Sequence, residues 1–217
     1  MCNLYSVTKG QQAIRGFTRA MTDTTGNLPS MPSVFPDYAA PIVRNGPKSG
    51  RELTLMRWGF PPPPKLGTQP VTNVRNVASP YWRTWLKPEW RVVVPATSFA
   101  EYEDTRPKKT PVWFARDETR PLFCFAGIWR FWKGTRKKAE GEMEHRLFSF
   151  LTCEANNVVA PIHPKAMPVI LTTQEEIDIW LTAPAEEALA LQRPLPDDAL
   201  TIVARGERKD EAGNLAA

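Results

Sequence analysis

Apolar residues in the middle of the chain form short, dense runs that indicate β-strands. The main runs are β-branched or aromatic and are bounded by strand-breaking residues, at positions 91–95, 112–116, 122–132 and 146–153. Shorter runs of the same kind occur at 53–58, 169–171 and 200–203. The third main run is long and partly alternating, so we expect it at the centre of a sheet, followed by a charged hairpin loop over 133–144.

The N-terminal part has a helical period. Ile14, Phe17 and Met21 recur at helical spacing, which predicts a helix of about fifteen residues after Tyr5. The following segment, from 22 to 50, is polar and rich in proline and glycine. This composition predicts a long irregular segment.

Two further helix starts are marked by capping patterns. Ser79 and Pro80 match an N-cap followed by proline at the first helical position. Thr173 and Glu176 match a capping box. A second short helix is expected over 184–191.

Many strands and a few short helices, with no internal repeat, favour the α+β class. We expect a single domain over residues 1–204, built on a mainly antiparallel, barrel-like β-sheet with peripheral helices. The polar residues 205–217 are expected to form a disordered C-terminal tail.

Composition narrows the function classes. The chain has 217 residues and a formal net charge of +5, which permits a nucleic-acid partner without requiring one. No apolar run approaches the roughly 20 residues that span a bilayer. The first residues lack the basic and apolar regions of a secretory signal. We therefore expect a protein without membrane attachment that stays in the cytoplasm.

Cysteine and histidine are few. Cys2, Cys124 and Cys153 cannot make a disulfide framework, and an odd count fits a reducing compartment. The two histidines and the scattered cysteines do not have zinc-ligand spacing. We expect neither a metal nor another cofactor.

Cys2 combines two reactive groups once Met1 is removed. Methionine aminopeptidases generally act when residue 2 is small, and cysteine is small enough. The new terminus then carries an α-amine and a thiol on adjacent carbons. An aldehyde can form a Schiff base with the amine, and the thiol can close it to a thiazolidine. These groups titrate near about 8.0 and 8.5, so both react near neutral pH. The alternative is that Cys2 is an accident of the second codon.

Three other residues stand where chemistry is plausible. Asn73 lies in a polar stretch before an expected helix. Glu101 follows an apolar strand between aromatic residues, where its pKa would be raised. His163 lies between two prolines on a rigid loop, which suits proton transfer. Each also has an ordinary interpretation, as a turn residue, a solvated hairpin charge and a loop residue respectively.

Taken in order, these positions resemble the SRAP (SOS response-associated peptidase) family. The resemblance spans about residues 1–185 and is carried by five motifs. These are Met1-Cys2, the WGF of Trp58 to Phe60 before a proline-rich loop, the N-x-R of Asn73 to Arg75, the F-x-E-Y of Phe99 to Tyr102, and the I-H-P of Ile162 to Pro164. Each motif is weak alone, and their joint order makes the match specific.

The resemblance implies a covalent thiazolidine between Cys2 and the aldehyde of an abasic site in single-stranded DNA. Asn73 would hold the sugar or a developing oxyanion, and Glu101 would move protons. His163 would protonate or stabilise sugar oxygens and help to reverse the link, and Arg75 would hold a phosphate. The family is also credited with removing its own initiator segment. A monomer with a nucleoid-associated location is the matching expectation.

Basic and aromatic residues near these motifs suggest how DNA would bind. We expect one channel lined by Arg44, Lys48, Arg51, Arg57, Arg75, Arg83 and Lys165. Trp58 and Phe60 are expected to wedge against the last stacked base. The remaining basic clusters are interpreted as solvated hairpin tips, at Lys108, Lys109, Arg136, Lys137 and Lys138.

The chain departs from the family pattern at two places. Family members commonly continue Met-Cys-Gly-Arg, whereas Asn3 and Leu4 follow Cys2 here. The basic residue after the histidine is Lys165, which keeps the charge but loses the bidentate fork of arginine. These changes concern DNA affinity more than chemistry.

Two other functions stay open. One is a cysteine peptidase with Cys2 as nucleophile and its own amine or Glu101 as base, which would cleave unrelated peptides. The other is a nucleic-acid-binding module without catalysis, which would tolerate the loss of Cys2.

Overall fold

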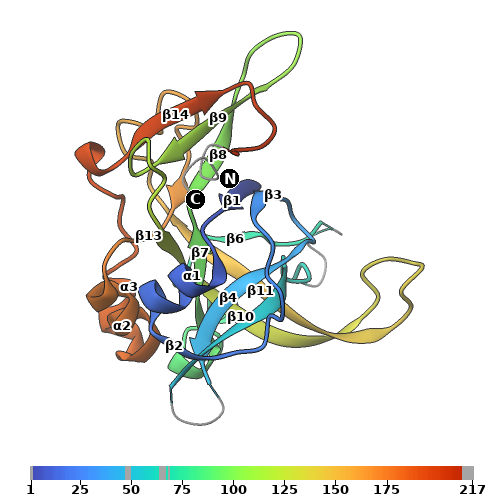
Figure 1. The fold of residues 1–217 in the computed structure, drawn as a ribbon. Coiled ribbons are helices and arrows are strands. Elements are labelled where there is room, and N and C mark those ends of the chain that lie inside the picture. The colour runs from blue at the N-terminus through green and yellow to red at the C-terminus, as the bar shows by residue number, and fades with distance from the viewer. Residues whose placement is uncertain (1, 47–49, 64–66, 68, 212–217) are drawn as a thin grey trace.

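A closed five-stranded barrel forms the centre of the molecule (Figure 1). The computed structural model describes residues 2–46, 50–63, 67 and 69–211. The barrel strands follow the order β11–β10–β7–β4–β5, and β5 pairs with β11 to close the ring. The closing pair is parallel and the four other pairs are antiparallel. These strands are β4 (Ala39–Asn45), β5 (Arg51–Trp58), β7 (Arg91–Ala96), β10 (Phe123–Gly134) and β11 (Met143–Cys153).

A second, five-stranded antiparallel sheet packs against the barrel. Its order is β14 (Thr201–Arg205), β9 (Thr110–Ala115), β8 (Ser98–Glu103), β1 (Leu4–Val7) and β3 (Met31–Val34). Tyr5 of β1 is buried in the shared core, where its ring meets Trp58 edge-on at 5.2 Å and Phe150 at 6.2 Å. The start of β1, and Cys2 before it, is thereby held against the barrel.

Short strands extend the barrel edges. β6, only two residues long, pairs in parallel with β11 at Phe150 and Leu151. The others pair with β5, β11 and β10 respectively. The four are β2 (Ala20–Asp23), β6 (Asn73–Val74), β12 (Met167–Pro168) and β13 (Ile170–Leu171).

The helices are short and peripheral. They are α1 (Gln11–Thr18), α2 (Gln174–Thr182) and α3 (Ala185–Leu189), with 3₁₀ turns η1 (Pro80–Trp82), η2 (Pro88–Trp90) and η3 (Asp197–Ala199). Figure 1 shows α2 and α3 together on one side of the barrel. Trp180 anchors α2, because its indole N–H donates to the carbonyls of Val92 and Gly127 at 2.8 and 3.1 Å. No helix in the described part of the chain has the length and apolar character to cross a bilayer.

The predicted α+β class with a mainly antiparallel barrel is confirmed. The apolar runs form β5, β7, β9, β10, β11, β13 and β14. The capping box is also present, since the Thr173 hydroxyl accepts from the Glu176 N–H at 3.1 Å. Local patterns therefore placed the buried strands and the best-capped helix.

The prediction for residues 5–50 is wrong in two respects. The expected fifteen-residue helix is limited to α1, and the residues before and after it form β1 and β2. Met21 lies in β2 and is 69% exposed, so its helical spacing with Ile14 and Phe17 has no packing role. The expected irregular segment contains β3 and β4. Pro41 is tolerated in β4 because β7 pairs with that strand only at Val43 and Arg44.

The helix expected at Ser79 and Pro80 is a single 3₁₀ turn, η1. The Ser79 side chain makes no capping hydrogen bond. A second proline, Pro88, begins η2 only a few residues later. A proline disfavours the α conformation in the residue before it, and Lys87, directly before Pro88, is extended.

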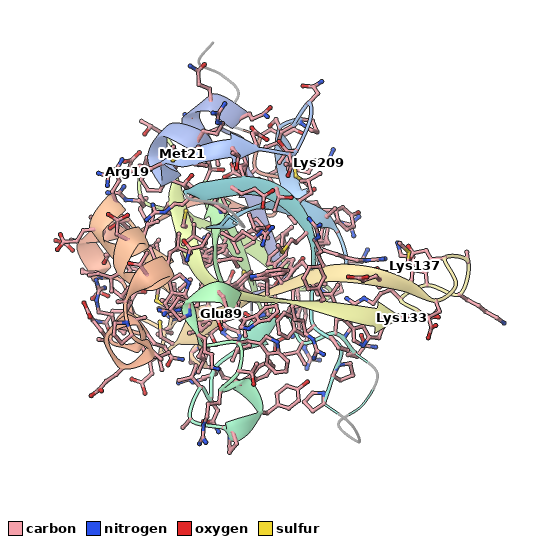
Figure 2. All side chains as sticks on the ribbon, turned by 90° about the horizontal axis from the view of Figure 1, so that it is seen from below. Arg19, Met21, Glu89, Lys133, Lys137 and Lys209 are labelled. Atoms are coloured by element: carbon pink, nitrogen blue, oxygen red, sulfur yellow. The ribbon has the colours of Figure 1, made fainter. Side chains whose placement is uncertain are left out.

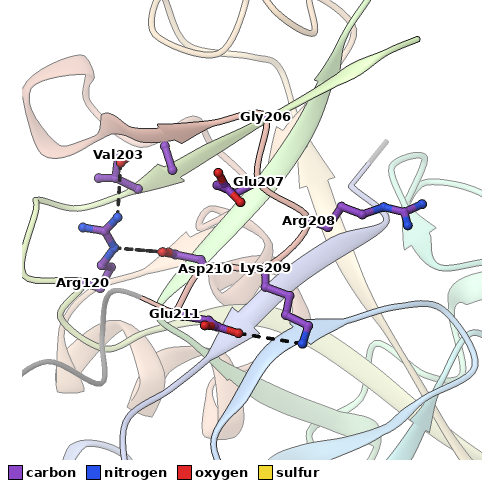
Figure 3. A pocket seen from close by; sticks show the side chains of 9 residues that line it. Arg120, Val203, Gly206, Glu207, Arg208, Lys209, Asp210 and Glu211 are labelled. Atoms are coloured by element: carbon purple, nitrogen blue, oxygen red, sulfur yellow. Dashed lines mark hydrogen bonds and ion pairs between the residues drawn. The ribbon is translucent and has the colours of Figure 1, made fainter.

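The expected disordered tail is wrong for residues 205–211. Asp210 is 3% exposed and forms an ion pair with Arg120 at 3.2 Å, which Figure 3 shows as a dashed line. The Ser98 hydroxyl donates to the same carboxylate at 2.5 Å. A buried, paired aspartate fixes this segment against β8, although its sequence is polar throughout. Residues 212–217 lie outside the described residues.

A long hairpin of β10 and β11 projects from the barrel, and Figure 2 shows Lys133 and Lys137 on it. Arg136 was expected to be a solvated tip. Instead it is largely buried, with an ion pair to Asp37 at 3.1 Å and a hydrogen bond to the Gly59 carbonyl at 2.9 Å. The hairpin loop is thus tied back to the barrel.

Candidate active site

Cys2 lies directly before β1 and is completely buried. Its Sγ donates to the Leu4 carbonyl at 3.4 Å. Burial raises the pKa of the thiol well above its ordinary value, and the nearby Glu101 carboxylate raises it further. The thiol is therefore protonated at neutral pH and needs a base before it can act as a nucleophile.

Asn73 holds the backbone of Cys2. Its Nδ2 donates to the Cys2 carbonyl at 2.8 Å and to the Thr72 hydroxyl at 2.7 Å. That hydroxyl donates in turn to Oδ1 of Asn3 at 3.0 Å. Asn73 Oδ1 is buried without a hydrogen-bond partner among the described residues. The side chain thus anchors the start of the chain and keeps one acceptor unused.

Trp58 supports this arrangement from inside the barrel. Its indole N–H donates to the Thr72 carbonyl at 3.1 Å, and its ring stacks on Phe150 at 5.1 Å. Trp58 and Phe60 are both 0% exposed. Neither ring offers a face to a nucleotide in this structure. We therefore leave both out of the proposed DNA-binding surface and assign Trp58 a positioning role.

Glu101 lies inside β8, not in the solvated hairpin of its ordinary interpretation. β8 pairs with β1 through Ala100 and Leu4, which brings Glu101 next to the residues before β1. The side chain belongs to a residue that is 2% exposed, and burial raises its carboxyl pKa to about 7. A carboxyl group with this pKa can both accept and release a proton near neutral pH.

His163 lies in the loop between β11 and β12. Its backbone N–H donates to the Val159 carbonyl at 2.8 Å, and its Nδ1 donates to the Ala166 carbonyl at 2.9 Å. Burial lowers the pKa of His163, and the charge of Lys165 lowers it further. The ring is therefore neutral at pH 7. Because Nδ1 carries the proton, Nε2 has the lone pair.

Arg75 connects this loop to β6. It follows Asn73 by two residues, and its guanidinium donates to the Lys165 carbonyl, two residues after His163. Arg75 and Lys165 are both exposed. The loop with His163 therefore lies beside β6, the strand whose Asn73 binds the Cys2 carbonyl. Arg75 and Lys165 are the two cations at the surface there. Arg83 is also exposed, at the end of η1, and no contact connects it to this group in the described structure.

The other expected channel residues are engaged elsewhere. Arg44 pairs with Glu52 at 2.7 Å, and Arg51 pairs with Asp178. Arg57 pairs with Asp37 at 2.7 Å and with Glu140 at 2.8 Å. Their charges are neutralised by partly buried carboxylates, so they do not line a DNA channel. Lys48 lies outside the described residues.

Sequence reasoning missed several residues that complete the site. Thr72 and Asn3 form the hydrogen-bond chain beside Cys2. Tyr102 was noted in a motif without a role; burial raises the pKa of its phenol, and Cys2 and Glu101 raise it further. The polar pair Thr72-Asn73, between Val71 and Val74, was the one available signal. No cluster of three or more possible metal ligands is present in the described ranges.

A model of the family described as SOS response associated peptidase (SRAP) matches residues 1–206. The chain belongs to the SRAP family. The abasic site processing protein YoqW of Bacillus subtilis (strain 168) is 30% identical over 146 residues, which cover 64% of this chain and 61% of that protein. YobE of the same organism is 29% identical over 146 residues, covering 64% and 62%. The match thus spans about three fifths of these curated relatives.

Solved structures show the same fold for this SRAP member. A protein from Bordetella bronchiseptica superimposes with a TM-score of 0.74 at 24% identity, covering 94% of this chain and 98% of that one. A protein from Bacteroides thetaiotaomicron gives 0.69 at 22% identity, covering 93% and 90%. At these identities the likeness concerns the fold alone.

Proposed function

We propose that Cys2, after removal of Met1, forms a covalent thiazolidine with the ring-opened aldehyde of an abasic site in single-stranded DNA. Support comes from family membership and from relatives named as abasic site processing proteins. The observation that carries the proposal is convergence on Cys2. The Asn73 amide donates a hydrogen bond to the Cys2 carbonyl, and the Glu101 carboxylate raises the pKa of the Cys2 thiol.

The reaction needs two steps and no outside oxidant. The α-amine of Cys2 adds to the aldehyde carbon, and loss of one water gives an imine. The thiol then adds to the imine carbon, its proton passes to nitrogen, and a five-membered ring closes. Both steps are reversible, since hydrolysis returns the aldehyde and the free amine and thiol.

Glu101 fits the proton transfers. The thiol holds its proton at neutral pH, so a base must accept it before sulfur attacks. The Glu101 carboxyl titrates at about 7 and is close enough to affect the thiol. It would take the thiol proton as sulfur attacks the imine carbon, and return that proton to nitrogen as the ring closes.

Asn73 fits the sugar. With Nδ2 bound to the Cys2 carbonyl, its unused Oδ1 can accept a hydrogen bond from a sugar hydroxyl. Burial of Cys2 also favours an abasic residue, because a sugar without a base needs less room than a complete nucleotide. The site would in this way exclude undamaged DNA from the reaction.

His163 and the two surface cations complete the assignment. Neutral His163 would accept a proton from a sugar oxygen at Nε2, and return it during reversal. Arg75 and Lys165 would bind a phosphate beside the lesion, since both are exposed near β6. Arg83 is kept as a further proposed phosphate contact, since it is exposed at the end of η1.

A gel experiment tests the proposal. Purified protein is mixed with abasic single-stranded DNA, and intact mass spectrometry establishes whether Met1 is absent. We expect a denaturation-resistant adduct from the wild type and none from Cys2→Ser, because an oxazolidine hydrolyses readily. The serine variant keeps its amine, so borohydride should trap a Schiff base. A stable adduct of wild-type yield from Cys2→Ser would exclude the thiazolidine.

A peptidase acting on the chain's own first residue is the second candidate. The family description names a peptidase, and the complete burial of Cys2 favours the adjacent Met1 peptide bond over an unrelated protein substrate. Expression in a strain with aminopeptidase inhibited separates the two activities. Loss of Met1 under that condition supports self-processing, whereas retained Met1 with no crosslink assigns the step to the host enzyme.

A further inference from the structure

A groove of about 520 Å³ lies between the β8–β9 turn and the segment 206–211. We call it the basic groove and define it by Phe35, Tyr102, Lys108, Lys109 and Arg208, which all line it. Its three cations are exposed, and no acidic residue is among the described residues that line it. A cleft with one sign of charge concentrates ligands of the opposite sign.

Arg208 is held in place from both sides. Before it, the Gly206 N–H donates to the Pro111 carbonyl at 2.9 Å, and the Trp113 indole donates to the Glu207 carbonyl at 2.8 Å. After it, Asp210 is fixed by its buried carboxylate. In Figure 3, Arg208 points away from the Asp210 side chain. The segment therefore presents this guanidinium from a fixed backbone.

The lysine side of the groove is ordered as well. The Thr105 hydroxyl donates to the Lys108 carbonyl at 2.7 Å and lies 2.6 Å from the Thr110 hydroxyl. Lys109 forms an ion pair with Asp104, with Nζ 3.8 Å from Oδ1, and both side chains are largely exposed. An exposed ion pair at this distance contributes little, so the charges remain available to a ligand.

Tyr102 connects the groove to the proposed reaction site. It follows Glu101 directly in β8 and is 36% exposed. Burial raises the pKa of Tyr102, Arg208 lowers it, and Cys2 and Glu101 raise it. Because Tyr102 lines the groove and directly follows Glu101 in β8, the groove begins one residue along the strand from the proposed reaction site. In the view of Figure 1, the β8–β9 end lies above β1, and β6, which leads to Arg75, lies below it.

We propose that the basic groove binds single-stranded nucleic acid on one side of the residue that reacts with Cys2. Phosphates would contact Lys108, Lys109 and Arg208, and a base would stack on Tyr102. Arg75 and Lys165 would hold the strand on the other side. This inference rests on the proposed function for the position of the lesion, and it revises the interpretation of Lys108 and Lys109 as solvated tips.

Binding of an undamaged oligonucleotide, ten thymidines long, tests the groove without any crosslinking. The double variant Lys108→Glu and Arg208→Glu should weaken binding at least about tenfold and reduce the salt slope by roughly 1.4, or about 0.7 per phosphate. The matched control is Lys133→Glu with Lys137→Glu on the projecting hairpin (Figure 2), which changes the net charge equally. Equal losses in both double variants would overturn the groove.

Two further arms locate and identify the ligand. Two abasic oligonucleotides are compared, one extended only to the 5′ side of the lesion and one only to the 3′ side. The groove variant should bind one of them more weakly than the wild type does and the other equally well. An equal loss of affinity for both contradicts the groove. A polyglutamate that competes with the thymidine oligonucleotide as well as another oligonucleotide would assign the groove to acidic proteins and overturn the proposal. Groove-dependent binding in a wild type that forms no adduct would reject the proposed function and leave the groove supported.

Discussion

The side-chain amide of Asn73 donates a 2.8 Å hydrogen bond to the backbone carbonyl of Cys2, across 71 positions of sequence. This contact holds Cys2, the proposed nucleophile, through its backbone carbonyl. The amine and thiol of Cys2 take no part in the contact and can react. Asn73 is itself fixed, because β6 pairs with β11 at Phe150. The barrel thus positions the start of the chain through one buried amide.

Asn73→Ala should slow crosslinking about 10²-fold, the scale expected when a reacting group is misplaced by about 1 Å. It should also cost about 1–3 kcal/mol of folding free energy, because the buried Cys2 carbonyl loses its donor. Single-turnover crosslinking and urea unfolding measure the two effects. Asn76→Ala is the control, since Asn76 is exposed three residues later. A wild-type rate for Asn73→Ala would remove Asn73 from the site.

Glu101 predicts a pH dependence. Its carboxyl has a raised pKa of about 7, so it is mostly protonated below that pH and ionised above it. The basic form increases with pH, and the crosslinking rate should rise toward pH 7 and level off above it. Glu101→Gln should be about 10²–10⁴-fold slower and lack this step. Any titration that remains in the variant comes from the other proton-transfer groups of the site, the Cys2 amine and His163. An unchanged profile in Glu101→Gln would contradict the assignment.

His163→Ala should slow formation or reversal of the adduct by about 10²–10⁴-fold. The neutral ring presents Nε2 as acceptor because Nδ1 donates to the Ala166 carbonyl. The other histidine, His145, is the control: it stacks on Trp132 at 5.5 Å in the projecting hairpin. His145→Ala should leave both rates unchanged. Formation and release from a labelled oligonucleotide measure them, and equal effects of the two substitutions would refute the role of His163.

The sequence predicted what depends on local pattern. β7, β10 and β11 were foreseen because each is a dense apolar run, and α2 because its capping box lies within four residues. A barrel-like sheet was predicted, but the pair of strands that closes it was not. Closure depends on Leu147 of β11 lying beside Arg57 of β5, and pairing between residues so far apart leaves no local signature.

The site was predictable only in part. Cys2, Asn73, Glu101 and His163 could be singled out because their chemistry and motifs are visible in the sequence. Burial could not be foreseen for Trp58, whose aromatic ring suits either a core or a base. The predicted DNA channel was wrong for a related reason. An arginine such as Arg57 looks available for DNA in the sequence, because its ion pairs with Asp37 and Glu140 become visible only in the structure.

Asp210→Ala should destabilise the protein by about 3–5 kcal/mol, because it leaves the buried Arg120 without its carboxylate. The segment 206–211 should also become sensitive to proteolysis. Glu211→Ala is the control, since Glu211 is exposed and its ion pair with Lys209, at 3.8 Å, is exposed as well. That change should stay within about 0.5 kcal/mol. Equal stability of the two variants in urea would show that Asp210 does not hold this segment.

Arg75→Ala should weaken single-stranded DNA binding evenly across sequences. Phosphate contacts release counterions, so log K should fall linearly with log salt, at about −0.7 per phosphate neutralised. Three to five contacts would give the wild type a slope of about −2 to −3.5, and the variant should be shallower by roughly 0.7. The crosslinking rate at saturating DNA should change much less, because Arg75 positions the strand and lies outside the proton path.

The arginine also donates to the Lys165 carbonyl, so its removal can shift the loop that carries His163. Arg75→Lys separates the two effects, because it keeps the charge. If phosphate binding dominates, Arg75→Lys should retain most of the slope and affinity at every salt concentration. If the loop contact dominates, Arg75→Ala should lower the crosslinking rate at saturating DNA, as His163→Ala does, because the loop that carries His163 has shifted. Binding that does not depend on salt, or a strong preference for one base beside the lesion, would show that the strand lies on another surface.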